Sequence, residues 1–289
     1  MSKRKFGDRK DGRRIQLPGL MQCCIDLKPL RSNNEVYINE MMDVTELVKF
    51  IEEKKQNGIK YTYFQAFMTA IAKVIYNRPK LNYFIKNRHM YEHNTISLAF
   101  VAKVTLDDKS EELMLILDID PEDTIESITK KLNDKIEKLR NKTTVKRGSN
   151  NAIDYLCKLP NPIRIPVFGL IKWLDKHGWV PNSLMTDNIY YSSMIVSNLG
   201  SINCGAIYHN INEFGSSSSL TTIGKIEKQE VIAKDGSRTV KDMCEFGITL
   251  DERIGDGFYF AKSCKMIEYV LMHPETLEEP INTPINCDK

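Results

Sequence analysis

Apolar and polar positions follow two different periods along this chain, and together they predict both strands and helices. Residues 36–42 have the pattern of a strand, and Asp43-Val44-Thr45-Glu46 then carries an acceptor side chain and an acid, which is typical of a helix start. Residues 63–76 are apolar on nearly all sides and predict a buried helix that Arg78-Pro79 ends. The chain therefore opens with a strand and two helices.

The middle of the chain is predicted to add strands and a long surface helix. Residues 85–91 and 95–106 are expected to pair as strands, and residues 112–119 form a further strand. From Pro121 onward, apolar residues recur every three to four positions as far as Leu139, with charged residues between them. That spacing predicts a helix lying over a sheet, and the polar run 141–151 after it is predicted to be a loop.

The last part of the chain contains an apolar block and then returns to strands. Residues 157–181 hold four prolines and both tryptophans, and are too short and interrupted to span a membrane. We interpret them as a subdomain packed on the core, with a lid or a partner-docking surface as the alternative. Strands are predicted at 190–197, 220–226 and 243–250, and a closing helix at 257–272.

The charge of the chain is concentrated at its N-terminus. The net charge is +3, yet residues 1–14 hold seven Lys or Arg against two Asp, so the rest of the chain carries 34 basic and 36 acidic residues. No basic stripe continues from this segment, so we expect a solvated leader and no nucleic-acid partner.

The cysteines and the lengths of the hydrophobic runs indicate in which cellular compartment the protein is expected. Seven cysteines lie without metal-binding or redox spacing, which favours a reducing cytoplasm and no bound metal. No run approaches the roughly 20 apolar residues of a membrane span, and the N-terminus has no apolar signal region. We therefore expect a soluble, cytoplasmic protein with no membrane partner.

Three short motifs, in order along the chain, point to one family. The segment Asp251-Glu252-Arg253-Ile254-Gly255-Asp256-Gly257 resembles the DHRxxDG signature of the acyltransferase cores of 2-oxoacid dehydrogenase complexes, and the HxxxDG of chloramphenicol acetyltransferases. Residues 43–47 resemble that family's DVTEL helix start, and residues 197–200 its SNLG strand end. The resemblance covers Arg31 to Pro274, and it implies a chloramphenicol-acetyltransferase-like fold: an α/β two-layer sandwich with a mixed sheet covered by helices.

The resemblance also assigns roles to particular residues. The family's histidine is its general base, and Glu252 stands in that position here. The family's aspartate before glycine is a structural residue in an ion pair, which corresponds to Asp256, and its partner is expected to be Arg31, with Arg13 or Arg14 as alternatives. Ser197 matches the serine whose hydroxyl faces the oxyanion.

The substitution at Glu252 leaves the identity of the base open. A carboxylate is a weaker base than imidazole at neutral pH unless its surroundings raise its pKa. His209 lies twelve positions after Ser197, in a region that lines the acceptor pocket of related enzymes, and it is the alternative base. An ordinary loop histidine has the same sequence appearance.

The resemblance implies a coenzyme A-dependent acyltransferase that moves an acyl group between coenzyme A and a thiol, amine or hydroxyl acceptor. The alternative is an inactive relative that serves as a binding or assembly module. Residues 1–30 would form the tail and lead-in, 31–277 the catalytic-type domain and 278–289 a C-terminal tail. This chain has no lipoyl domain, so a free acceptor or a separate lipoyl carrier is required, and the related cores imply a homotrimer.

Overall fold

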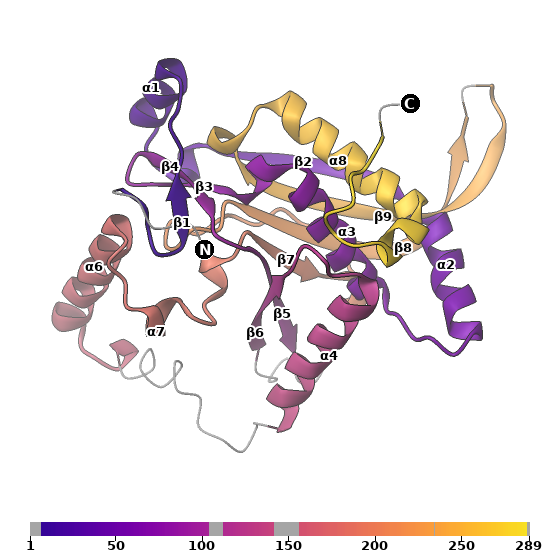
Figure 1. Ribbon diagram of the computed structural model, residues 1–289, viewed down its shortest axis with the longest axis horizontal. Coiled ribbons are helices and arrows are strands. Elements are labelled where there is room, and N and C mark those ends of the chain that lie inside the picture. The colour runs from indigo at the N-terminus through magenta and orange to yellow at the C-terminus, as the bar shows by residue number, and fades with distance from the viewer. Residues whose placement is uncertain (1–6, 104–111, 142–155, 234, 288–289) are drawn as a thin grey trace.

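The computed structural model describes residues 7–103, 112–141, 156–233 and 235–287, and a six-stranded mixed sheet is its centre (Figure 1). The strand order is β2-β9-β8-β7-β5-β6. Strand β7 runs parallel to both of its neighbours, and the other pairs are antiparallel. The bounds are β2 (Glu35–Asp43), β5 (Ile96–Lys103), β6 (Glu112–Ile119), β7 (Met194–Asn198), β8 (Ser219–Ile232) and β9 (Arg238–Asp251). The predicted mixed sheet is confirmed.

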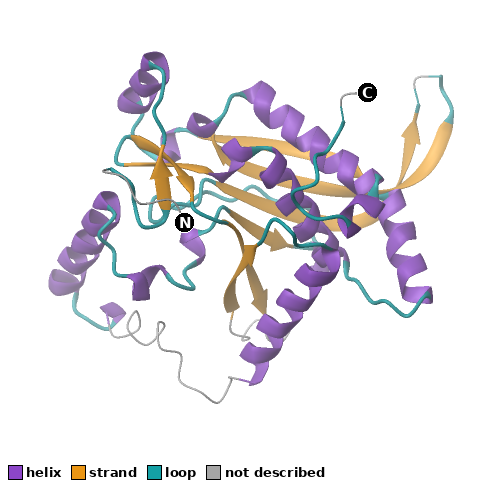
Figure 2. Cartoon of the chain, in the orientation of Figure 1, coloured by secondary structure: helices purple, strands orange, loops and turns teal. Residues whose placement is uncertain are grey.

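Four helices pack on one face of this sheet and form the main core (Figure 2). They are α2 (Thr45–Gln56), α3 (Tyr63–Asn77), α4 (Ile125–Asn141) and α8 (Gly257–Met272). Helix α3 lies innermost, since every residue from Gln65 to Ile75 is buried. Its Phe67 meets Phe246 of β9 edge to face, with ring centroids 5.4 Å apart. The predicted buried helix and closing helix are confirmed, and the helices cover the sheet as expected.

The opposite face of the sheet carries a smaller apolar cluster and an irregular segment, residues 203–214. Side chains alternate between the two faces of a strand. In β7, Met194 and Val196 belong to the helix-covered core, whereas Ile195 belongs to the smaller cluster with Ile211. The backbone of Ser197 is therefore placed to project its side chain on the same side as Ile195.

The predicted pairing of residues 85–91 with residues 95–106 is wrong. Residues 83–93 fold back on themselves as β3 (Tyr83–Lys86) and β4 (His89–His93), while β5 pairs with β6. Asn87 and Arg88 both have positive φ, 49° and 65°, which is the conformation of a two-residue type I′ hairpin turn. Residues 86–89 at this turn are all polar, but they lack the glycine that usually marks a two-residue hairpin turn.

Residues 7–14 of the N-terminal segment are part of the folded body, not a solvated leader, and residues 1–6 lie outside the described residues. Strand β1 (Gly12–Arg14) adds to β4 and completes a three-stranded sheet. Arg9, just before it, is only 5% exposed, and its guanidinium is held by Asp11 at 2.8 Å. Arg9 and Asp11 therefore form an internal ion pair, which charge counting along the sequence does not detect.

Residues 157–181, the apolar block, do not form the subdomain packed on the core that we preferred as the interpretation of the sequence. The block forms one helix, α6 (Asn161–His177), and the short α7 (Asn182–Met185) follows it. Asp175 is the one buried residue of α6, so the block is not packed on the core. No helix in the described part of the chain is both long and apolar enough to cross a membrane. The loop predicted at 141–151 lies outside the described residues beyond Asn141.

Candidate active site

The motif at residues 251–257 begins in the buried end of β9 and ends at the start of α8. Asp251 is the last residue of β9 and is fully buried. Its carboxylate accepts two hydrogen bonds from the Arg253 guanidinium, at 2.8 and 2.6 Å, and its Oδ2 lies 3.7 Å from Nε of Arg31. One carboxylate is thus shared by two buried arginines. Burial lowers the pKa of Arg31, and the charge of Asp251 opposes that shift.

The ion pair expected between Asp256 and Arg31 is not formed, because Arg31 lies against Asp251 instead. The 3-10 turn η6 (Glu252–Ile254) carries the chain out of the buried corner, so Asp256 reaches the surface. There its carboxylate accepts the backbone N–H of Tyr259 at 2.7 Å and caps α8. The alternatives Arg13 and Arg14 point elsewhere: Arg13 pairs with Glu92, and Arg14 lies 3.0 Å from His89.

Glu252 lines an open groove of about 610 Å³ between β2 and the start of α8. Its side chain is 43% exposed and lies 3.3 Å from the ammonium of Lys28. Its backbone N–H donates to the carbonyl of Asn34 at 2.8 Å, which fixes the turn. The other lining residues are Val36, Ile38, Glu40, Gly255, Asp256, Gly257, Phe260 and Ala261. The residue in the histidine position of the motif is therefore accessible to a solute.

Ser197 lies near the end of β7 and is half-buried. It stands in register with Thr222 of β8, whose hydroxyl donates to the carbonyl of Ile207. Within the described residues, no hydrogen bond engages the Ser197 hydroxyl, so it is available to donate to a bound group. The segment 203–214 crosses the sheet at Thr222, the neighbour of Ser197 on β8, where Ile207 is hydrogen-bonded.

His209 is exposed on the segment 203–214. Its Nδ1 lies 2.9 Å from the carbonyl oxygen of Asn210. A carbonyl can only accept, so this contact requires the proton on Nδ1 and leaves a lone pair on Nε2. That tautomer suits a general base. No contact joins His209 to Ser197 or Glu252 among the residues described.

One chain does not bring these three residues together. Ser197 is in register with Thr222, and Thr222 with Gly247 of β9. Asp251 lies four residues beyond Gly247, which at about 3.4 Å per residue is about 14 Å along the strand.

Glu252 and His209 also lie on opposite sides of β2. Val36 and Ile38 face the groove of Glu252, whereas Tyr37, on the other face, meets Tyr208 with ring centroids 5.2 Å apart. Within one subunit, Glu252 is therefore not placed to orient His209.

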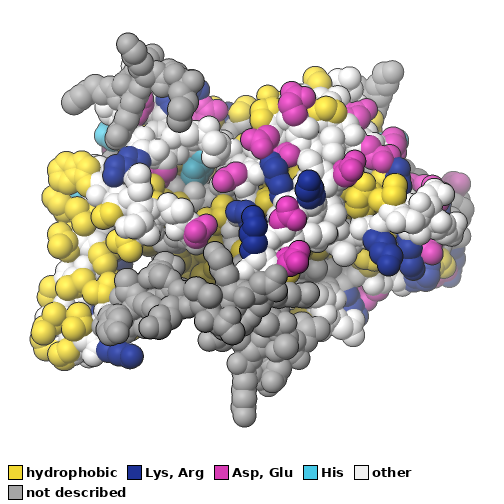
Figure 3. All heavy atoms as spheres, turned by 60° about the horizontal axis from the view of Figure 1, so that its bottom comes forward, with side chains coloured by type: hydrophobic (Ala, Val, Ile, Leu, Met, Phe, Trp, Pro, Cys, Tyr) yellow, Lys and Arg dark blue, Asp and Glu magenta, His cyan; other side chains and the backbone are white. Residues whose placement is uncertain are grey.

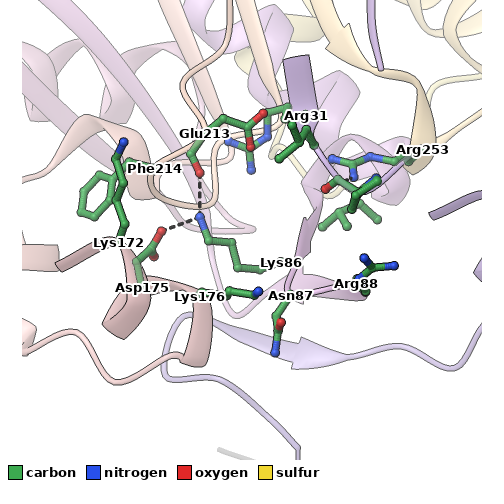
Figure 4. Close-up of a pocket in the computed structure, with 13 residues that line it drawn as sticks. Arg31, Lys86, Asn87, Arg88, Lys172, Asp175, Lys176, Glu213, Phe214 and Arg253 are labelled. Carbon is green, nitrogen blue, oxygen red and sulfur yellow. Dashed lines mark hydrogen bonds and ion pairs between the residues drawn. The ribbon is translucent and has the colours of Figure 1, made fainter. Parts of the chain in front are cut away.

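A second cavity, of about 360 Å³, lies beside the buried arginines and was not predicted from the sequence (Figure 4). Its charged lining residues are Arg31, Lys86, Arg88, Lys172, Asp175, Lys176, Glu213 and Arg253. In Figure 4 the Lys86 side chain reaches between Glu213 and Asp175. Its ammonium pairs with the Asp175 carboxylate and donates to the Glu213 carbonyl at 2.7 Å.

Asp175 contacts several of the polar groups in and behind this cavity wall. It is 1% exposed and accepts from the Tyr191 hydroxyl at 2.8 Å and from the Gly215 N–H at 3.0 Å, while Arg9 lies 3.6 Å away. Burial lowers the pKa of Lys86 to about 8, even though Asp175 opposes the shift, and burial raises the pKa of Tyr191. These residues come from distant parts of the chain, so no local spacing could have signalled them.

The carboxylates that line the two cavities are not clustered as metal ligands. Across the described ranges, no group of three His, Cys, Asp or Glu side chains is arranged to hold a metal ion. The groove of Glu252 offers apolar walls with carboxylates at its edge, which is an arrangement for a small organic group near a proton acceptor.

Comparison of the sequence with protein families gives one match. Residues 181–278 match the catalytic domain of the 2-oxoacid dehydrogenases acyltransferase family. This range includes Ser197, His209 and the whole 251–257 motif. No curated protein sequence matches the chain.

Comparison of the fold gives matches over nearly the whole chain. A probable dihydrolipoamide acetyltransferase from Listeria monocytogenes is 18% identical with a TM-score of 0.59, covering 93% of this chain and 96% of that one. The cubic core of a pyruvate dehydrogenase complex is 16% identical with a TM-score of 0.60, covering 92% and 94%. A chloramphenicol acetyltransferase is 13% identical with a TM-score of 0.53, covering 90% and 99%. The predicted resemblance and the chloramphenicol-acetyltransferase-like fold are confirmed.

Proposed function

We propose that this chain is an acyltransferase of the 2-oxoacid dehydrogenase type, which moves an acyl group between coenzyme A and a thiol, amine or hydroxyl acceptor. The family match over residues 181–278 and the shared fold support an acyltransferase of this type. Coenzyme A, the acceptor class and the roles of individual residues are our extension of that match.

One observation carries the proposal: the residue in the family's base position lines an accessible groove of about 610 Å³. Glu252 offers a proton acceptor at the edge of this groove. The groove volume lies within the usual range for a small-molecule site, about 300 to 1,000 Å³. Glu252 is therefore our first candidate for the base.

The separation of Ser197 from Glu252 supports a site shared between two copies of the chain. The oxyanion donor and the base must both lie within about 3 Å of the reacting atoms. Because one subunit holds them about 14 Å apart along the strands, we propose that a homotrimer places the base of one copy against the Ser197 face of the next.

The proposed chemistry needs one proton acceptor and one donor. Glu252 removes the proton from the acceptor as its heteroatom attacks the thioester carbonyl, and the Ser197 hydroxyl donates to the resulting oxyanion. Collapse of the tetrahedral intermediate breaks the carbon–sulfur bond, and the coenzyme A thiolate then takes the proton from Glu252. No metal or redox cofactor is needed for this balance.

The comparison structures are compatible with these roles. The work on the dihydrolipoamide acetyltransferase of Azotobacter vinelandii, 15% identical over 92% of this chain, concerns a serine, a histidine and an asparagine in catalysis. That histidine and asparagine are four positions apart, as are Glu252 and Asp256. We propose that Asp256 acts here by capping α8 and fixing the groove edge. His209 stays the second candidate for the base.

The test is release of thiol from a panel of acyl-coenzyme A thioesters in the presence of candidate acceptors. Wild-type turnover should fall about 10²-fold or more in Ser197→Ala and in Glu252→Gln, while coenzyme A binding stays near normal. Ser237→Ala, in the turn between β8 and β9, is the matched serine control and should keep full activity. Full activity in both Ser197→Ala and Glu252→Gln would contradict the proposed roles.

A binding or assembly module without catalysis is the second candidate, and one observation favours it. Glu252 is half-exposed and lies against Lys28, whereas a catalytic carboxylate is usually activated by burial. This alternative predicts stabilisation by coenzyme A, about 2.7 kcal/mol at 100 times its dissociation constant, with no turnover for any thioester. Thermal shift and turnover measured together separate the two candidates.

A further inference from the structure

The cavity beside the buried arginines carries more positive than negative charge. Six of its lining side chains are cationic and only two, those of Asp175 and Glu213, are acidic, which leaves an excess of four positive charges. Among the described residues, none lines both this cavity and the groove of Glu252. The excess therefore belongs to a cavity separate from the candidate active site.

Part of this excess is buried. Arg31 and Arg253 are only 2% and 7% exposed, and they share one carboxylate, that of Asp251. By contrast, the neighbouring Lys86 pairs with the buried Asp175. A buried charge without a counterion of its own is costly, and an anion bound in the cavity would reduce that cost.

Cationic groups of the cavity wall have donors that are not in use. The Nε of Arg31 is buried and makes no hydrogen bond to any described residue, and its nearest carboxylate oxygen, on Asp251, is 3.7 Å away. Lys172 and Lys176 of α6 are exposed, and no hydrogen bond or ion pair engages either ammonium in the part of the chain described. These donors are available to a ligand.

The cations approach the cavity from different sides. In Figure 4, Lys176 extends from α6 toward the middle of the cavity, and Arg31 and Arg253 lie across from it. The outward side of α6 is mostly hydrophobic, as the left edge of Figure 3 shows, so the lysines that line the cavity lie on the side turned to the body. Donors that converge in this way suit an anion whose oxygens accept from several directions.

The two acidic side chains do not cancel the positive charge of the cavity. Asp175 pairs with Lys86 and accepts two further hydrogen bonds from behind the wall. Glu213 is exposed, and its carboxylate accepts the backbone N–H of Ser32 at 2.8 Å. Both carboxylates thus have partners of their own, and positive charge remains for a ligand.

We propose that this cavity binds the phosphate group of a small organic molecule. A phosphate ester carries about −1.5 to −2 charges at neutral pH and offers three acceptor oxygens, which matches an excess that one carboxylate cannot balance. Arginine and lysine are the side chains that bind phosphate groups in proteins. The apolar lining residues Leu30, Ile85 and Phe214 would contact the organic part. The volume of about 360 Å³ is large enough for a small molecule.

Calorimetric titration of the full chain at neutral pH tests this proposal. We expect saturable binding of inorganic phosphate and of glycerol 3-phosphate, weakened by added sodium chloride, and no binding of acetate at the same concentration. Failure of both phosphates to bind at millimolar concentration and low salt would overturn the proposal. Tighter binding of succinate than of either phosphate would also overturn it, in favour of a dicarboxylate.

A competition titration identifies the source of the phosphate group. Coenzyme A carries phosphates, so displacement of inorganic phosphate by coenzyme A would assign this cavity to the substrate of the proposed acyl transfer. Phosphate binding that coenzyme A leaves unchanged would assign the cavity to a separate small molecule. Both results support a phosphate site, and because binding is measured without turnover, its failure is distinguishable from failure of the proposed function.

Variants then assign the binding to this cavity. Lys172→Gln with Lys176→Gln should weaken phosphate binding about tenfold or more, because two positive charges near the anion are lost. Lys60→Gln with Lys130→Gln removes the same charge from exposed positions that do not line the cavity, and should bind phosphate normally.

The same double variant at Lys172 and Lys176 tests a purely structural role for these lysines. Positive charge near the end of a helix stabilises it without any ligand. If the variant lowers the Tm in the absence of phosphate and leaves phosphate affinity unchanged, the lysines serve only the end of α6 and the proposal is wrong. We expect an almost unchanged Tm without phosphate and a smaller rise in Tm than the wild type when phosphate is added.

Discussion

The charged residues of the 251–257 motif are neighbours in sequence, but they fall into two sets with opposite environments, one buried and one exposed. Asp251 and Arg253 are buried and bound to each other and to Arg31. Glu252 and Asp256 are exposed and line an open groove. A single motif therefore contains a structural part, where each group has a charged partner inside the fold, and a solvent-facing part that lines the groove.

This difference predicts which substitutions in the motif the fold tolerates. Replacing Asp251 or Arg253 would leave a buried charge without its counterion, which is strongly destabilising. Replacing the residue at position 252 costs the fold little, because its side chain is half in solvent. We therefore expect position 252 to tolerate substitution without loss of the fold.

The largest effect is expected in the buried part. Asp251→Asn removes the counterion of Arg31 and Arg253 and should lower the free energy of unfolding by about 3 to 5 kcal/mol. Denaturant titration measures it. A loss below about 1 kcal/mol would show that the corner relaxes to admit water, and the contrast with the groove would fail.

Acid sensitivity should also come from buried groups. Burial lowers the pKa of His93 to about 4, against 6.5 in the unfolded chain. Between these values the unfolded chain binds more protons, so stability is fully present above pH 6.5 and is lost as pH falls toward 4. The loss should reach about 3 kcal/mol.

The control for this pH dependence is a pair of histidine variants. His93→Gln keeps a donor for the Ser216 carbonyl, which lies 3.3 Å from His93 Nε2, and should flatten the profile between pH 4 and 6.5. His209→Gln, exposed, should leave it unchanged. A profile that stays steep in His93→Gln would assign the acid sensitivity to other groups.

The helix cap in the groove should have a moderate effect. Asp256→Ala removes the acceptor for the Tyr259 N–H and should cost about 1 kcal/mol in unfolding free energy. Asp256→Asn retains an N-cap acceptor and should cost only a few tenths. Equal losses in both variants would mean that the charge of Asp256 matters more than the cap.

The smallest effect on stability is expected at Glu252. Its exposed pair with Lys28 should contribute between about 0 and 1 kcal/mol, so Glu252→Gln should change the unfolding free energy by less than about 1 kcal/mol. The same variant should lose most of its acyl transfer. A large stability loss would move Glu252 from the chemical to the structural part of the motif.

The sequence predicted those elements in which the hydrophobic periodicity extends over many residues and the start is marked by nearby residues. Helix α8 was predicted with its observed bounds, because Asp256-Gly257 begins it and the apolar positions continue to Met272. The turn at Asn87 and Arg88 was missed because Arg88 stands where such a turn usually has glycine, and the polar residues 86–89 were included in a predicted strand.

The sequence could predict which residues belong to the candidate site, but not how they are arranged in space. Glu252, Ser197 and His209 could be singled out by position, but their separation depends on strand register. The pairing of Arg31 with Asp251 joins residues 220 positions apart, and the choice between two aspartates five positions apart is decided by the η6 turn. The cavity around Lys86 and Asp175 had no sequence signal at all.

The central claim, a catalytic site shared between copies, is tested most directly by mixing two inactive variants. Ser197→Ala and Glu252→Gln subunits are unfolded, combined in equal amounts and refolded together, and thiol release from an acyl-coenzyme A is measured. If each site takes its serine from one copy and its base from the next, random assembly restores about a quarter of the sites. The account predicts activity near a quarter of a wild-type sample treated in the same way, and no recovery above the separate variants would contradict it.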